Sequence, residues 1–308
     1  MKKLTLIIAI LLLGQVSGET IVVDQSGAGD YTTIQIGLNN TVTNDTVLVR
    51  PGTYIEGISF PSNRKIYLIG SGADVTIIYY ISETVYLRSE SVLSGFTIES
   101  TTGIAINATD GPVATIKNCI IKGGSSKYAV EASSVNFFNN VISHSSYGLK
   151  TSGSNTKVQN SIFRGVTYGV SNTGSTITVE NNIFENTNYA IQQSNSANYI
   201  LSIYNCFSAD SQNNFTGGAV AGIGDLQNTD PKFDDITKSY LLNSDSPTRD
   251  AGNPAATYND GDGSRNDMGV YGGPNSWGTG PVITDLSISP TTINQGGTIT
   301  IEATAKKK

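Results

Sequence analysis

Asn118-Cys119-Ile120-Ile121 is the first of five similar segments in this chain. The others are Asn139-Asn140-Val141-Ile142, Asn160-Ser161-Ile162-Phe163, Asn181-Asn182-Ile183-Phe184 and Asn205-Cys206-Phe207-Ser208, with spacings of 21, 21, 21 and 24 residues. Ser94-Gly95-Phe96-Thr97 fits the same alignment 24 residues earlier. A fixed spacing of twenty-odd residues is the signature of a solenoid, in which each repeat forms one coil.

Apolar residues alternate around each Asn of the repeat. They lie two positions before it, at Ile116, Phe137, Val158, Val179 and Ile203, and two positions after it, at Ile120, Val141, Ile162, Ile183 and Phe207. This alternation is typical of a strand and places the Asn on the apolar face. Stacked amides can bond to one another from rung to rung. We therefore predict a buried, structural amide ladder at Asn118, Asn139, Asn160, Asn181 and Asn205.

A second strand start recurs at Tyr128-Ala129-Val130, Tyr147-Gly148-Leu149, Tyr168-Gly169-Val170 and Tyr189-Ala190-Ile191. About three short strands fit each coil, and the coils are too short to hold a crossover helix. The pattern therefore predicts an all-β parallel solenoid. The Tyr column at Tyr128, Tyr147, Tyr168 and Tyr189 has two interpretations. It is either an aromatic platform for sugar rings or a stack that closes a turn between strands.

The two cysteines provide a geometric prediction. In this alignment Cys119 and Cys206 occupy the same place in the repeat, four rungs apart. Rungs about 4.8 Å apart would separate them by roughly 19 Å, too far for a disulfide. We expect two free thiols.

Both ends of the chain differ from the repeat. Residues 1–18 begin with Met1-Lys2-Lys3, continue with an apolar run and end in small residues, which predicts a secretory signal peptide and no retained membrane span. Residues 33–42 carry Ile34, Leu38 and Val42 on one helical face, which predicts a short helix capping the first coil. Residues 19–275 would form the solenoid and 276–280 a linker. Residues 281–308 read as two strands that begin an incomplete immunoglobulin-like module.

Composition limits the partners. Only 14% of residues are charged, the net charge is −6 and the sequence pI is near 4.8. This balance argues against a phosphate-binding surface, so we expect no nucleic acid partner. A neutral or cation-bridged polysaccharide is compatible, and we expect a monomer.

The first coils resemble a known family. Ile21-Val22-Val23-Asp24-Gln25-Ser26-Gly27-Ala28-Gly29-Asp30-Tyr31, Val49-Arg50-Pro51-Gly52-Thr53-Tyr54 and Ile66-Tyr67-Leu68-Ile69-Gly70 resemble the opening coils of pectin methylesterases, within the pectate-lyase-like superfamily. Asp267-Met268-Gly269-Val270-Tyr271-Gly272-Gly273 is similar to the closing coil of secreted bacterial β-helix proteins. The resemblance implies a right-handed parallel β-helix.

The chemistry of that family is not evident in the sequence. The catalytic motifs of pectin methylesterases are absent. The acids of residues 105–200 are Asp110, Glu131, Glu180 and Glu185, and no two align on neighbouring coils. A glycosidase needs two facing carboxylates, and a lyase needs a base beside acids that hold calcium. The catalytic residues therefore stay unassigned.

One loop has the residue types of a calcium site. Asp260, Asp262, Ser264, Asn266 and Asp267 alternate with glycines and Arg265, a pattern that wraps a hard cation. The alternative is a turn whose side chains bond their own backbone. Tyr271 stands where an EF-hand loop would carry a bidentate Glu.

Three functions remain open for a secreted or cell-surface protein of this kind. The first is binding or display toward complex polysaccharide. The second is an enzyme on such a polysaccharide, either a lyase or a carbohydrate esterase. The third is a structural adhesin or spacer. Fold analogy alone does not choose among them.

Overall fold

The computed structural model describes residues 18–88, 90–124, 128–194, 199–209, 213–234 and 239–277, and the backbone of 282–289 and 300–306. The predicted signal peptide therefore lies outside the described residues, except for Gly18. Most of the predicted linker also lies outside them.

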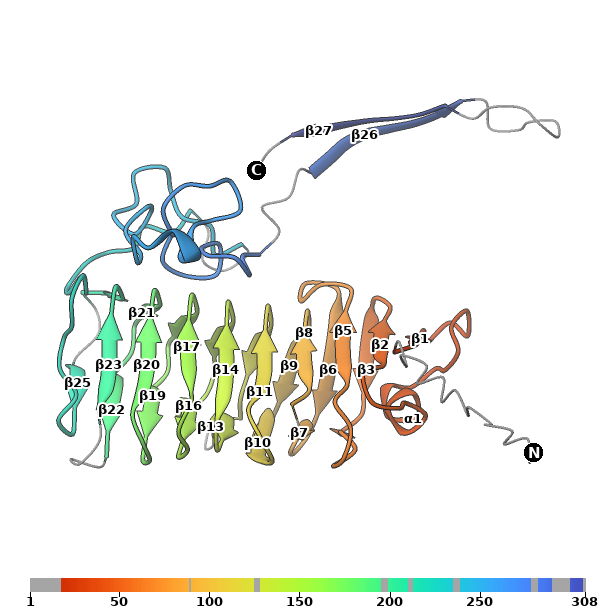
Figure 1. The fold of residues 1–308 in the computed structure, drawn as a ribbon, viewed down its shortest axis with the longest axis horizontal. Helices are drawn as coiled ribbons and strands as arrows, with labels where there is room; N and C mark the ends of the chain where they lie inside the picture. The colour runs from red at the N-terminus through yellow and green to blue at the C-terminus, as the bar shows by residue number, and fades with distance from the viewer. Residues whose placement is uncertain are drawn as a thin grey trace, which may run out of the picture.

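Within the described residues, three parallel sheets run side by side along the molecule (Figure 1). Sheet A contains β1 (Thr20–Val23), β2 (Thr46–Val49), β5 (Tyr67–Gly70), β8 (Val92–Ser94), β11 (Ala114–Lys117), β14 (Val135–Phe138), β17 (Lys157–Gln159), β20 (Ile177–Glu180) and β23 (Ile200–Ile203). Sheet B contains β3 (Gly52–Ile55), β6 (Thr76–Tyr80), β9 (Thr97–Ser100), β12 (Ile120–Lys122), β15 (Val141–Ser143), β18 (Ile162–Arg164), β21 (Ile183–Glu185) and β24 (Cys206–Phe207). Sheet C contains β4 (Ile58–Ser59), β7 (Val85–Arg88), β10 (Ile106–Asp110), β13 (Tyr128–Ala132), β16 (Tyr147–Thr151), β19 (Tyr168–Asn172), β22 (Tyr189–Gln193) and β25 (Asn213–Thr216).

Each coil visits the three sheets in turn, and every strand pairs with the strand of the same sheet one coil away. Apolar side chains fill the interior in columns. In one of them the Phe163 and Phe184 rings stack with centroids 4.9 Å apart, and Phe184 and Phe207 follow at 5.2 Å. Stacked aromatic columns of this kind bury large apolar area and hold the rungs in register. The predicted all-β, right-handed parallel β-helix is confirmed.

The N-terminal helix is shorter than predicted. α1 spans Ile34–Asn39, with Ile34 and Leu38 buried, whereas Val42 lies beyond its end and is 55% exposed. Glu56 accepts hydrogen bonds from the backbone N–H groups of Ile34 and Gln35, at 2.8 and 3.0 Å, and so caps the first turn. The helix packs on β1, β2 and β4, and its role as a cap of the first coil stays a prediction.

The predicted Asn ladder is wrong by one residue for four of its five members. Asn118, Asn139, Asn160 and Asn181 have φ between 50° and 59°, which is the left-handed conformation that Asn tolerates. They form the bend between sheet A and sheet B, so their side chains leave the interior of the solenoid. Asn139, Asn160 and Asn181 are nevertheless buried, against residues 253–272. The inward positions are the residues that follow them, Cys119, Asn140, Ser161 and Asn182. On the next coil the inward residue is Asn205, which follows the left-handed Tyr204.

Hydrogen bonds from rung to rung confirm this register. The N–H of Cys119 donates to Asn140 Oδ1 at 3.0 Å, and that of Ser161 donates to Asn182 Oδ1 at 2.8 Å. The N–H of Asn182 donates to Asn205 Oδ1 at 2.9 Å. Asn205 is therefore the one predicted residue that lies in the interior ladder.

The same shift moves the cysteines. Cys206 pairs with Ile183, so it lies one position after the ladder that contains Cys119. Both thiols are free, as predicted, although they do not share a place in the repeat, and both are buried.

After the last coil the chain returns across the solenoid. The C-terminal segment, defined here as residues 239–277, includes the short helix η1 (Ala256–Tyr258) and lies over the ends of the sheet A strands (Figure 1). Beyond it, β26 (Val282–Ser289) and β27 (Thr300–Lys306) form an antiparallel pair. The immunoglobulin-like module stays a prediction.

Candidate functional site

The column of bend asparagines fixes the C-terminal segment to the solenoid. Asn139 Nδ2 donates to the carbonyl of Gly272 at 2.8 Å, and Asn160 Nδ2 donates to the carbonyl of Asp267 at 2.9 Å. Asn181 Oδ1 accepts the N–H of Asn253 at 2.8 Å. A Cβ at Gly272 would lie 2.6 Å from Asn160 Nδ2, so only glycine permits this approach. These outward amides thus hold a segment roughly a hundred residues away in sequence.

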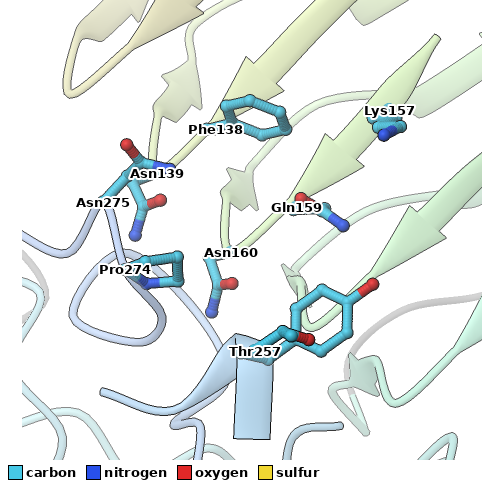
Figure 2. A pocket seen from close by; sticks show the side chains of 9 residues that line it. Phe138, Asn139, Lys157, Gln159, Asn160, Thr257, Pro274 and Asn275 are labelled. Atoms are coloured by element: carbon cyan, nitrogen blue, oxygen red, sulfur yellow. The ribbon is translucent and has the colours of Figure 1, made fainter. Parts of the chain in front are cut away.

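A pocket of about 250 Å³ opens where this segment meets the outer face of sheet A. Figure 2 shows its side chains, which come from β14, β17, the bends after these strands, η1 and the end of the C-terminal segment. The lining residues are Phe138, Asn139, Lys157, Gln159, Asn160, Thr257, Tyr258, Pro274 and Asn275. We call this the sheet A pocket.

A buried carboxylate lies beside the sheet A pocket and organises it. Glu180 is 1% exposed, and its Oε2 accepts a hydrogen bond from Gln159 Nε2 at 2.8 Å. Burial, followed by the charge of Glu180, raises the pKa of Tyr258. Glu180 is therefore occupied in positioning Gln159, Asn253 and Tyr258 and does not line the pocket itself.

The pocket offers hydrogen-bonding and aromatic groups without an acid pair. Asn275 provides an amide, Thr257 and Tyr258 provide hydroxyls, and Lys157 provides an exposed cation. The Nδ2 groups of Asn139 and Asn160 are committed to the C-terminal segment, and the Nε2 group of Gln159 is committed to Glu180. Phe138 and Tyr258 add aromatic surface. Among the nine lining residues none carries a carboxylate, so the pocket lacks the two acids that glycoside hydrolysis requires.

The other acids of the central coils have cationic partners. Glu131 pairs with Lys150 and Glu185 pairs with Arg164, each at 2.8 Å. Asp110 lies 3.6 Å from Arg88. These acids therefore form ion pairs with cations on a neighbouring coil.

The four predicted Tyr residues form a continuous column on sheet C. The rings of Tyr147 and Tyr168 stack with centroids 4.5 Å apart and an angle of 8° between their planes. For Tyr168 and Tyr189 the centroid distance is 4.9 Å and the interplanar angle is 15°. Tyr128 tilts at 59° against Tyr147. Because the ring faces cover one another, a sugar would meet mainly ring edges there. The stacking therefore favours the interpretation as a turn-closing column, and sugar contact stays a prediction.

The predicted calcium loop bonds largely to itself. Asp262 Oδ1 accepts from the N–H and hydroxyl of Ser264 at 3.0 and 2.6 Å, and Asp260 Oδ1 accepts the N–H of Gly273 at 2.6 Å. Asn266 is buried against Asn160, and Asp267 Oδ1 accepts the N–H of Asp250 at 2.7 Å. Across the described ranges no group of three or more His, Cys, Asp or Glu side chains is arranged to hold a metal. Calcium binding stays a prediction.

The sequence did not reveal the sheet A pocket. Gln159 and Tyr258 have no distinguishing motif, and they lie 99 residues apart. Polar residues on the outer face of β17, opposite the apolar Val158, were the available signal. They do not show which later segment would cover them.

Comparison with known proteins supports the fold. Residues 64–208 match the family model described as the right handed beta helix region. A pectin methylesterase solved in complex with hexasaccharide VII has a TM-score of 0.52 and 13% sequence identity, covering 74% of this chain and 98% of that one. Pectin methylesterase PemA from Erwinia chrysanthemi has a TM-score of 0.48 and 11% identity, covering 67% and 80%. The likeness to the hexasaccharide complex shows that this chain and that pectin methylesterase share a fold, as the opening coils predicted.

No curated protein sequence matches this chain significantly. Over the described residues, no helix has the length and apolar character needed to cross a membrane.

Proposed function

We propose that this protein is a secreted or cell-surface β-helix that binds complex polysaccharide in the sheet A pocket without cleaving it. The observation that carries the proposal is the lining of that pocket, which combines amides, hydroxyls, a lysine and aromatic surface with no carboxylate. Sugars are recognised by such groups, because amides and hydroxyls both donate and accept hydrogen bonds.

The charge of the pocket favours an acidic polysaccharide. Lys157 lines it, and Lys117 Nζ lies 3.5 Å from Oδ1 of the lining residue Asn275. A uronate carboxylate would gain a charge-assisted hydrogen bond from either lysine. The structural likeness to pectin methylesterases is compatible with this substrate class, although it supports the fold alone.

The test is a binding and turnover assay on a polysaccharide panel, with and without calcium. We expect retention of the mature protein on immobilised polygalacturonate, with no unsaturated products from it and no methanol released from methyl-esterified pectin. Products would favour the lyase or esterase alternative. If the assay shows no products and no retention, the adhesin or spacer alternative remains.

A pair of lysine variants locates the contact. Lys157→Thr should weaken retention about fivefold, because one hydrogen bond to a charged group is lost. Thr is compatible with this place, since Thr178 occupies the same register position one coil later. Lys122→Thr, on sheet B, is the matched control and should bind as the native protein does. Equal retention by both variants would contradict the assignment.

A further inference from the structure

A second cavity lies where the C-terminal segment stops covering the solenoid. It measures about 550 Å³ and is lined by Gly70, Ser71, Gly72, Ala73, Asp74, Ser94, Gly95, Asn118, Ile120, Ser239, Tyr271 and Trp277. None of these residues lines the sheet A pocket. Its volume is within the range of small-molecule sites. We call it the Trp277 trench.

The trench continues the column of bend residues that the C-terminal segment covers. Strand register places Gly70, Gly95 and Asn118 at the same position as Asn139, Asn160 and Asn181 on the following coils. A side chain at Gly70 or Gly95 would collide with the backbone of the other glycine, so two rungs carry no side chain. The bend column is therefore filled by the protein's own segment on three rungs and opens into the trench on the next three.

The first open rung has an unsatisfied acceptor. Asn139, Asn160 and Asn181 each form a hydrogen bond with the C-terminal segment. Asn118 Oδ1 is buried and has no hydrogen-bond partner among the described residues. A buried polar atom without a partner costs free energy. Asn118 lines the trench, so a turn of its side chain toward the cavity would let Oδ1 accept a hydrogen bond from a ligand and remove that cost.

Trp277 forms a rigid wall of the trench. Its Nε1 donates to the carbonyl of Asn139 at 2.6 Å. Its ring packs edge-on against the rings of Tyr240 and Tyr271, with ring centroids 6.1 and 6.3 Å apart. Tyr271 is held in turn by a 2.7 Å hydrogen bond to the carbonyl of Ser239. An aromatic wall fixed before binding loses little entropy when a sugar packs against it.

Charge selects the class of sugar. Asp74 lines the trench and is exposed, and its charge contributes to the raised pKa of Tyr271, after burial. Asp74 and Asn118 Oδ1 both accept hydrogen bonds, so the trench suits a donor with many hydroxyls and repels a carboxylate.

We propose that the Trp277 trench is a second saccharide subsite, which takes a neutral, hydroxyl-rich pyranose unit. The proposal rests on the proposed function, because it assumes that the protein meets polysaccharide. Two rungs of about 4.8 Å separate Gly70 from Asn118, so the trench would hold a short stretch of a chain along the solenoid axis. The protein would then bind a polymer that carries both acidic and neutral units.

The experiment uses the fluorescence of Trp277, the single tryptophan of the chain. The mature protein is titrated with cellotetraose and mannotetraose as neutral probes and with tetragalacturonate as the acidic one. We expect a saturable change in emission with a neutral probe. Asn118→Gly keeps the left-handed backbone and removes the acceptor, so it should weaken that binding about fivefold.

The matched control is Asn155→Gly, which makes the same change at an exposed left-handed Asn outside the trench, and it should bind as the native protein does. Asp74→Asn should let tetragalacturonate change the emission, because the repelling charge is gone. No saturable response to either neutral probe, or an equal response in Asn118→Gly, would overturn the proposal.

The two proposals fail separately. If the emission of Trp277 does not respond to the neutral probes but retention on polygalacturonate depends on Lys157, the subsite is refuted and the proposed function stands. If the emission of Trp277 does not respond and no polysaccharide retains the protein, both the subsite and the proposed function are refuted.

Discussion

Asn182 shows how one residue supports the solenoid from inside. Its Nδ2 donates to the carbonyls of Val158 and Glu180 and to Asn205 Oδ1, at 2.9, 3.0 and 3.0 Å, while its Oδ1 accepts the N–H of Ser161. It is fully buried. An amide with every hydrogen bond made is tolerated in an apolar interior, and its removal leaves its partners unpaired.

Asn182→Ala should therefore lower the free energy of unfolding by about 2–4 kcal/mol, as several buried groups lose their partner. Asn136→Ala is the control: this side chain lies half-buried on the outer face of sheet A and makes one 3.5 Å contact with Thr115. We expect a change within about 0.5 kcal/mol for it. Urea unfolding followed by circular dichroism measures both. Equal costs would show that the inner ladder is not the stabilising one.

Asp260 gives the C-terminal segment a dependence on pH. Burial raises its pKa to about 6, although hydrogen bonds from Gly273 and Asp267 oppose the shift. The raised pKa means that the folded state holds the proton more tightly than the unfolded state. The contribution to stability is therefore fully present below about pH 4 and is lost as the pH rises through 6.

Asp260→Asn should remove this dependence, so the variant should gain stability relative to the native protein as the pH rises from 4 to 7. Asp245→Asn is the opposite control, because its hydrogen bond to Lys232 lowers the pKa of Asp245. The contribution of Asp245 is present above about pH 4 and is lost only as the pH falls further, so the profile of this variant should run parallel to that of the native protein between pH 4 and 7. Thermal unfolding at several pH values measures both, and parallel profiles for Asp260→Asn and the native protein would disprove the assignment.

At the scale of elements, the sequence predicted the strands well and the bend poorly. The Tyr column was placed in correct register, since Tyr128, Tyr147, Tyr168 and Tyr189 all start sheet C strands. The Asn column was displaced because a left-handed residue between β14 and β15, or between β17 and β18, interrupts strict alternation. Two consecutive polar residues at a bend do not show which one points inward.

The sequence predicted that the C-terminal segment closes the solenoid, but it did not predict which residues of the solenoid this segment contacts. Asn266 reaches back to Asn160 and also donates to the carbonyl of Tyr258 at 2.7 Å. Such a contact, between residues 106 positions apart, leaves no periodic trace in the sequence. The sheet A pocket and the Trp277 trench both depend on this segment, so neither could be predicted.

Asn266→Ala should loosen the C-terminal segment while the solenoid stays folded. We expect faster proteolysis within residues 250–277 and an unchanged circular dichroism spectrum, because the sheets do not depend on this side chain. Asn259→Ala is the control, since Asn259 Nδ2 bonds only within its loop, to the carbonyl of Gly263 at 3.0 Å. Protection equal to that of the native protein would show that the segment is held by its other contacts.

At the scale of the whole molecule, the solenoid is a one-dimensional stack in which each coil contacts its neighbours. The stability of such a stack is close to a sum of coil and interface terms, so its ends open more easily than its middle. Cys119 lies in the middle, before β12, which has a sheet B strand on either side. Cys206 begins β24, the last strand of sheet B in the described residues.

The two buried thiols can therefore report the order of unfolding. Burial raises the pKa of each to about 12, so iodoacetamide at pH 8 should label neither in the folded protein. In rising urea we expect Cys206 to be labelled at a lower concentration than Cys119, because the end coil opens first. Pulsed labelling followed by peptide mass spectrometry measures both midpoints, and the single variants Cys119→Ser and Cys206→Ser assign the signals. Coincident midpoints would mean that the solenoid unfolds as one cooperative unit, and earlier labelling of Cys119 would mean that its weakest point lies in the central coils.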